Sequence, residues 1–116
     1  MDKLIRFVEK CIDLTKKREL TKENLDALAK MIAEEGIKFE EEIEGMNKYN
    51  PVFVLKCVRK IKKIVNESLA MINLMESRLS IGDYGFVLKG LLKTRKILNK
   101  LNSTYTRCCR KLRKAA

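Results

Sequence analysis

The sequence predicts an all-α protein, a four-helix up-down antiparallel bundle. Apolar residues recur at steps of three and four along four segments, and no stretch keeps the period of two that is typical of a strand. The 116 residues include only 5 Gly and 1 Pro, too few for the turns of a β-sandwich or β-barrel. Because 46% of the residues are hydrophobic, we expect residues 1–116 to build one core and form a single domain.

The first helix is predicted to start at Asp2, whose side chain can cap it, and to end near residue 18. Three consecutive cations at residues 16–18 fall in the last turn, where the helix dipole favours positive charge. The residues that line its apolar face are Leu4, Val8, Cys11, Ile12 and Thr15.

The second helix is predicted to follow an N-cap at Thr21. Gly36 leaves two alternatives open. It is either a close-packing position in one long helix, or the residue that ends one helix before another begins. The apolar line on which it falls is Leu25, Leu28, Ile32, Gly36, Phe39, Ile43 and Met46.

The last two helices are predicted to form a long hairpin. Asn50 and Pro51 form a cap followed by a first helical residue, so the third helix covers residues 51–79. A short turn follows, and Asp83 caps the fourth helix. Each helix is about 45 Å long at 1.5 Å per residue. Short connections make successive helices antiparallel neighbours.

Charge divides the chain at Pro51. Residues 1–50 hold 10 Lys+Arg and 12 Asp+Glu, whereas residues 51–116 hold 16 Lys+Arg and 3 Asp+Glu. The helices of the first half are thus slightly acidic, and the C-terminal hairpin is strongly basic. Such a contrast is typical of a protein that binds nucleic acid or an anionic membrane surface.

The fourth helix carries a stripe of cations on the side opposite its apolar face. Pairs four residues apart on this stripe are like-charged, which destabilises an isolated helix and would be relieved by a bound polyanion. The outward positions hold Lys89, Lys93, Lys96, Lys100, Arg107, Arg110 and Lys114, and Arg95, Lys111 and Arg113 broaden the stripe.

The third helix adds cations that the hairpin brings to the same end of the bundle. In an antiparallel hairpin centred on residue 81.5, residues equally far from that point lie at the same height. Lys56 is then level with Arg107, and Lys63 is level with Lys100. The residues expected to assist the stripe are Lys56, Arg59, Lys60 and Lys63. An alternative is that acidic residues of the second helix neutralise these cations, because reflection about residue 48.5 places residues 34–35 level with residues 62–63.

These features predict a small basic protein that binds DNA or RNA through the phosphate backbone, with little sequence specificity, as a subunit of a nucleoprotein assembly. Aromatic residues are not interleaved with the stripe, so reading of base edges is not expected. Tyr49, in a predicted loop, is the better candidate for stacking on a base, and Tyr105 falls on the core line. The main alternative is an adaptor whose basic helix docks on an acidic protein surface. Membrane-surface binding is a weaker alternative, because the core needs the apolar face of the fourth helix.

Segment 69–92 holds more apolar residues than one core face requires. Unless the first two helices cover them, the surplus forms an interface with another copy or with a partner protein. The candidate interface residues are Met71, Leu74, Phe86, Leu88 and Leu92.

Composition argues against catalysis, and we expect no cofactor and no metal. The chain has no His and no glycine-rich phosphate loop. Its 4 Cys lack the spacing of a zinc site and are expected to be reduced and buried. No segment resembles a membrane span or a signal peptide, so we expect an intracellular protein, cytoplasmic or associated with a nucleoid or nucleus.

Overall fold

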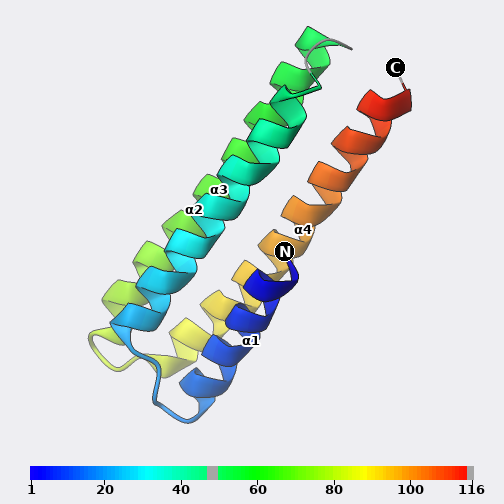
Figure 1. Cartoon of the computed structure of the whole chain (residues 1–116). Coiled ribbons are helices and arrows are strands. Elements are labelled where there is room, and N and C mark those ends of the chain that lie inside the picture. The colour runs from blue at the N-terminus through cyan, green and yellow to red at the C-terminus, as the bar shows by residue number, and fades with distance from the viewer. Residues whose placement is uncertain (47–49, 115–116) are drawn as a thin grey trace.

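The chain folds into an antiparallel four-helix bundle, as predicted (Figure 1). The computed structural model describes residues 1–46 and 50–114. Its helices are α1 (Asp2–Lys16), α2 (Lys22–Glu44), α3 (Pro51–Leu79) and α4 (Tyr84–Lys114). Each helix runs against its neighbour in sequence, and α1 also packs against α4. The part of the chain that the structure describes contains no strand.

The predicted caps start three of the four helices. Thr21 and Asn24 form a capping box at the start of α2. The side chain of Asn50 accepts a hydrogen bond from the backbone N–H of Phe53 at 3.1 Å. Asp83 accepts one in the same way from Phe86, also at 3.1 Å. These side chains satisfy backbone donors that the first turn of a helix leaves free.

The start of α1 differs from the prediction. Asp2 is not the cap: it is the first helical residue, and Met1 takes the N-cap position without a side-chain hydrogen bond. The amino group of Met1 forms an ion pair of 3.2 Å with the Glu35 carboxylate of α2. This contact fixes the chain start against α2, and the Asp2 carboxylate still benefits from the positive end of the helix dipole.

Gly36 lies inside one continuous α2, which settles the alternative that the sequence left open. The backbone of α2 approaches α3 closely at this point. A Cβ atom on Gly36 would lie 2.7 Å from Cγ2 of Val65. The glycine is therefore a packing position between two helices, and it fixes their register.

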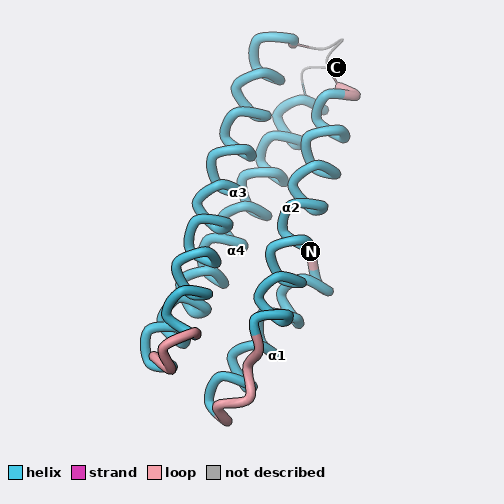
Figure 2. The backbone as a smooth tube through the Cα atoms, turned by 90° about the vertical axis from the view of Figure 1, so that its left-hand side faces the viewer, coloured by secondary structure: helices cyan, strands magenta, loops and turns pink. Residues whose placement is uncertain are grey.

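The two halves of the bundle are built differently because α1 has 15 residues and the other helices have 23 to 31. The whole molecule measures 51 × 21 × 18 Å. Figure 2 shows that α1 lies beside only one half of its length. We call this half, which contains the α3–α4 turn, the turn end. The other half, which we call the basic end, consists of α2, α3 and α4.

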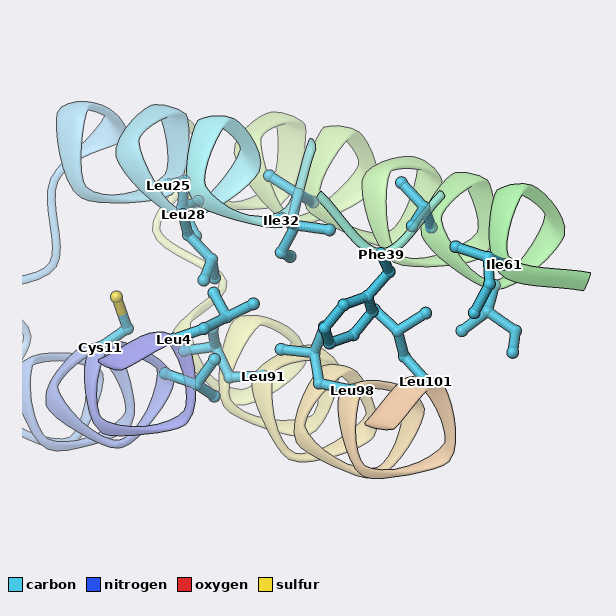
Figure 3. Close-up of a cluster of buried hydrophobic side chains, with 14 of the residues drawn as sticks. Leu4, Cys11, Leu25, Leu28, Ile32, Phe39, Ile61, Leu91, Leu98 and Leu101 are labelled. Atoms are coloured by element: carbon cyan, nitrogen blue, oxygen red, sulfur yellow. The ribbon is translucent and has the colours of Figure 1, made fainter. Parts of the chain in front are cut away.

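A single hydrophobic core runs through both halves. Figure 3 shows Phe39 of α2 reaching toward Leu98 and Leu101 of α4. Three buried hydroxyl residues interrupt the apolar faces, and each donates a hydrogen bond to the carbonyl oxygen four residues earlier in its own helix. Because their polar groups are satisfied, burial costs the bundle little. These residues are Thr15, Ser68 and Thr94.

Candidate nucleic-acid interface

Five cations converge on one groove between α3 and α4 at the basic end. The groove has a volume of about 350 Å³. Helix α3 contributes Lys60 and Lys63 to one wall, and α4 contributes Lys100, Arg107 and Lys111 to the other. All five side chains are exposed, so the groove presents positive charge from both sides.

The register of the hairpin produces this convergence. Gly90 of α4 packs against Met75 of α3, where an added Cβ would lie 2.6 Å from the sulfur atom. This contact gives the α3–α4 hairpin a register close to the predicted one, which is centred on residue 81.5. Lys63 and Lys100 then line the same groove, as their predicted common level requires.

The floor of the groove is apolar, which was not predicted from the sequence. Phe53 and Ile64 of α3 line it together with Cys108 and Thr104 of α4. Phe53 is half-buried, and Nζ of Lys111 lies 5.9 Å from the centre of its ring, within the range of a cation–π interaction. The helical spacing of residues 53, 60, 64 and 67 was the signal available in the sequence, since steps of three, four and seven share one face.

One acid opposes the cations of the groove. Glu67 lines it one helical turn beyond Lys63 and is exposed. Neither Glu67 nor any other carboxylate in residues 1–46 and 50–114 approaches a groove cation within 4.0 Å; the ion pairs found there are Met1 with Glu35 and Arg78 with Asp83. The groove therefore keeps a net positive charge that close ion pairs do not neutralise.

The acidic residues of α2 face α3 in a different register from the one predicted. The contact of Gly36 with Val65 places the centre of the α2–α3 hairpin two residues later than predicted. Residues 34–35 are therefore not level with residues 62–63, and that prediction is wrong. Glu40 instead lines a shallow groove with Lys62. Burial raises the pKa of Glu40; the charge of Lys62 opposes that rise, and Glu44 adds to it.

The cations of α3 thus divide between two neighbours. Lys62 lies beside the acidic face of α2, whereas Lys60 and Lys63 line the groove toward α4. The acidic residues of α2 therefore lie close enough to neutralise the charge of Lys62, but they do not face Lys60 and Lys63 in the groove.

The remaining predicted cations lie outside this groove. Arg110, Arg113 and Lys114 line a shallower hollow on the other flank of α4. Arg95 is half-buried, and the others are exposed on α3 and α4. These others are Lys56, Arg59, Lys89, Lys93 and Lys96.

Of the two tyrosines considered for base stacking, the structure describes only Tyr105. Tyr49 lies outside the described residues. Tyr105 stacks on Phe39, and its hydroxyl donates a hydrogen bond to the Glu42 carboxylate. Burial and this hydrogen bond raise the pKa of Tyr105. Its ring is thus engaged in packing between α2 and α4.

The candidate interface residues lie toward the turn end. Four of them are half-buried against the core, which accounts for much of the apolar surplus in segment 69–92. Leu74 is 45% exposed. The half-buried residues are Met71, Phe86, Leu88 and Leu92.

The cysteines are all buried and free. Burial raises the pKa of the Cys11 thiol to about 11, and burial together with the neighbouring Cys108 raises that of Cys57 to about 12. Protonated, buried thiols are poor nucleophiles. Across residues 1–46 and 50–114, carboxylates and thiols form no group of three or more placed to hold a metal ion. None of the four helices, as far as they are described, is long and apolar enough to cross a membrane.

Comparison of the chain with protein-family models, with curated proteins and with solved structures found no match.

Proposed function

We propose that the protein binds nucleic acid through the phosphate backbone, with little sequence specificity, as a subunit of a nucleoprotein assembly. The observation that supports the proposal is the convergence of Lys60 and Lys63 with Lys100, Arg107 and Lys111 on one groove. Cations on two walls of a groove attract a polyanion more strongly than the same cations spread over a convex surface, because their fields add within it.

The side chains available favour phosphate contacts over base reading. Lysine and arginine neutralise phosphates and release the counterions that surround a nucleic acid. Asn and Gln, which read adenine edges, do not line the groove. Affinity is therefore expected to depend steeply on salt and weakly on sequence.

Fluorescence anisotropy tests the proposal directly. Labelled single- and double-stranded DNA and RNA of unrelated sequences are titrated with the protein from about 50 to 300 mM salt. Binding that weakens steeply with salt and has a similar affinity for unrelated sequences supports backbone recognition. Absence of binding to all four polymers at the lowest salt overturns it, and docking on an acidic protein surface then becomes the preferred function.

The assembly part of the proposal rests on the apolar residues of segment 69–92. Leu74 is the exposed member of the candidate interface and is flanked by half-buried Met71. Light scattering of the free protein and of its nucleic-acid complex measures self-association. We expect Leu74→Glu to lower the mass of an oligomer without unfolding the monomer; a monomer in both samples contradicts self-association.

A further inference from the structure

The groove between α3 and α4 has the properties of a site for a single strand, and this inference rests on the proposed function. We infer that it holds single-stranded nucleic acid, with phosphates between the two rows of cations and one base stacked on Phe53. The width, the floor and the two ends of the groove each favour a single strand.

Width favours a single chain. The groove runs along the surface between two neighbouring helices of a bundle whose cross-section is 21 × 18 Å, so it occupies only a fraction of that width. A duplex is too wide to enter and touches only the cations on the rim. A single strand that lies along the groove can contact Lys60 and Lys63 on one wall and Lys100 and Arg107 on the other.

The floor favours a ligand that has an apolar part. Phe53, Ile64 and Cys108 line the groove below the cations. Neither the phosphates on the outside of a duplex nor inorganic polyphosphate gains from such a floor. An unpaired base does gain, because its face can stack on an aromatic ring.

The two ends of the groove are chemically different. At one end the Phe53 ring lies under Lys111, with 5.9 Å between Nζ and the ring centre. At the other end lies the Glu67 carboxylate, which repels phosphate. Phe53 and Glu67 are 14 positions apart, which corresponds to about 21 Å of helix, so the site accommodates a short stretch of strand. A base at the aromatic end and phosphates toward the middle match this order.

A tryptophan probe tests the inference. The chain has no Trp, so the variant Phe53→Trp carries a single tryptophan, which can be excited selectively over tyrosine, at the aromatic end of the groove. It is titrated with an unstructured single strand, with a blunt duplex of the same number of phosphates, and with inorganic polyphosphate. Phe7→Trp is the matched control, because Phe7 is also half-buried but lies on α1.

We expect the single strand to bind more tightly than the duplex and to quench the fluorescence of Phe53→Trp but not that of Phe7→Trp. Polyphosphate should bind without quenching. Equal affinity for strand and duplex, or strand binding without quenching, overturns the single-strand inference and leaves backbone binding intact. Failure of every polyanion to bind overturns the proposed function itself, so the two failures are distinguishable.

A second pair of variants removes dependence on the introduced tryptophan. Phe53→Leu keeps an apolar side chain and loses the ring, and Phe53→Tyr keeps the ring. We expect Phe53→Leu to weaken single-strand binding by about fivefold or more, which corresponds to the loss of one base–aromatic stack. Phe53→Tyr should retain the affinity, and duplex binding should be the same for both variants. Equal single-strand affinity of the two variants contradicts stacking on Phe53.

Discussion

The rings of Phe39 and Tyr105 stack almost in parallel, with their centres 3.9 Å apart and 8° between their planes. The contact joins α2 to α4 at the basic end, where α1 no longer separates or covers them. It leaves one flank of α4 held against α2 while the other flank faces the groove. The stack thus supports the helix that carries three of the five groove cations.

Loss of this stack should lower stability without affecting the groove. We expect Tyr105→Leu to reduce the free energy of unfolding by about 1–2 kcal/mol, because the ring pair contributes beyond its buried area. Tyr105→Phe keeps the stack and loses only the hydrogen bond to Glu42, at a cost of about 1 kcal/mol or less. Urea unfolding followed by circular dichroism measures both. A larger loss for Tyr105→Phe than for Tyr105→Leu would show that the stack is unimportant.

Gly36 should not tolerate a side chain. The added methyl of Gly36→Ala would lie 2.7 Å from Cγ2 of Val65, whose branched side chain has little freedom to move. The clash is expected to cost about 1–3 kcal/mol, more than the helix gains from alanine. Thermal unfolding should therefore show a net loss, and the added change Val65→Ala should relieve the clash.

The matched control is Gly85→Ala, in the exposed first turn of α4. The nearest atom to an added Cβ there is Oδ1 of Asp83, at 3.8 Å. This variant should be neutral or stabilising. Equal destabilisation by the two alanines would mean that Gly36 does not serve close packing.

Glu67 should weaken the binding of polyanions. Its carboxylate lines the groove together with Lys63 and Lys100 and opposes phosphate there. We expect Glu67→Gln to raise affinity and to steepen the dependence on salt, because the groove gains one net positive charge. Glu23→Gln, at an exposed position on α2 outside the groove, changes net charge equally and is the control. An equal effect of both variants assigns the change to overall charge.

Stability should depend on pH through Glu76. A hydrogen bond with Asp26, burial and the Asp26 charge raise the pKa of Glu76 above its ordinary value of 4.5, although Lys22 opposes the rise. A raised folded-state pKa means that ionisation of Glu76 costs stability at neutral pH and that the cost disappears as pH falls toward 4.5. Glu76→Gln should therefore stabilise the fold by about 0.2–0.5 kcal/mol at pH 7, as removal of a like-charge pair does.

The same variant at pH 4 is its own control. That pH lies below the ordinary pKa of 4.5 and further below the raised folded-state pKa of Glu76, so the difference in unfolding free energy between wild type and Glu76→Gln should be smaller than at pH 7. A constant difference across this pH range would exclude a charge effect between Glu76 and Asp26.

Helix positions and caps could be predicted from the sequence because they depend on local spacing. Thr21, Asn50 and Asp83 each satisfy donors within their own first turn, so a few neighbouring residues determine the outcome. Asp2 was misassigned because Met1 pairs with Glu35, 34 positions away in the chain. A contact between helices of this kind has no local signal.

The groove could be predicted only in part. The reflection about residue 81.5 related Lys63 to Lys100 because the α3–α4 turn is short and keeps the register. The longer connection before Pro51 made the α2–α3 register less certain, and there the contact of Gly36 with Val65 decided it. Phe53 and Glu67 were not predicted because neither carries positive charge, and the predicted site was defined by cations alone.

We expect the cations of the groove, and not the charge of the whole chain, to bind nucleic acid. The direct test compares two triple variants that lose the same charge. One removes the groove cations Lys63, Lys100 and Arg107 by substitution with Gln, and the other removes Lys3, Lys10 and Lys30, which are exposed on α1 and α2.

Anisotropy against one labelled single strand, at several salt concentrations, gives the affinity and the salt slope of each variant. We expect the groove variant to lose most of its affinity and its log–log salt slope to become shallower by about 2, the value for three lost contacts to a single strand. The control variant should keep a slope close to that of the wild type. Equal losses of affinity and slope in the two variants would contradict the assignment of the groove as the binding site.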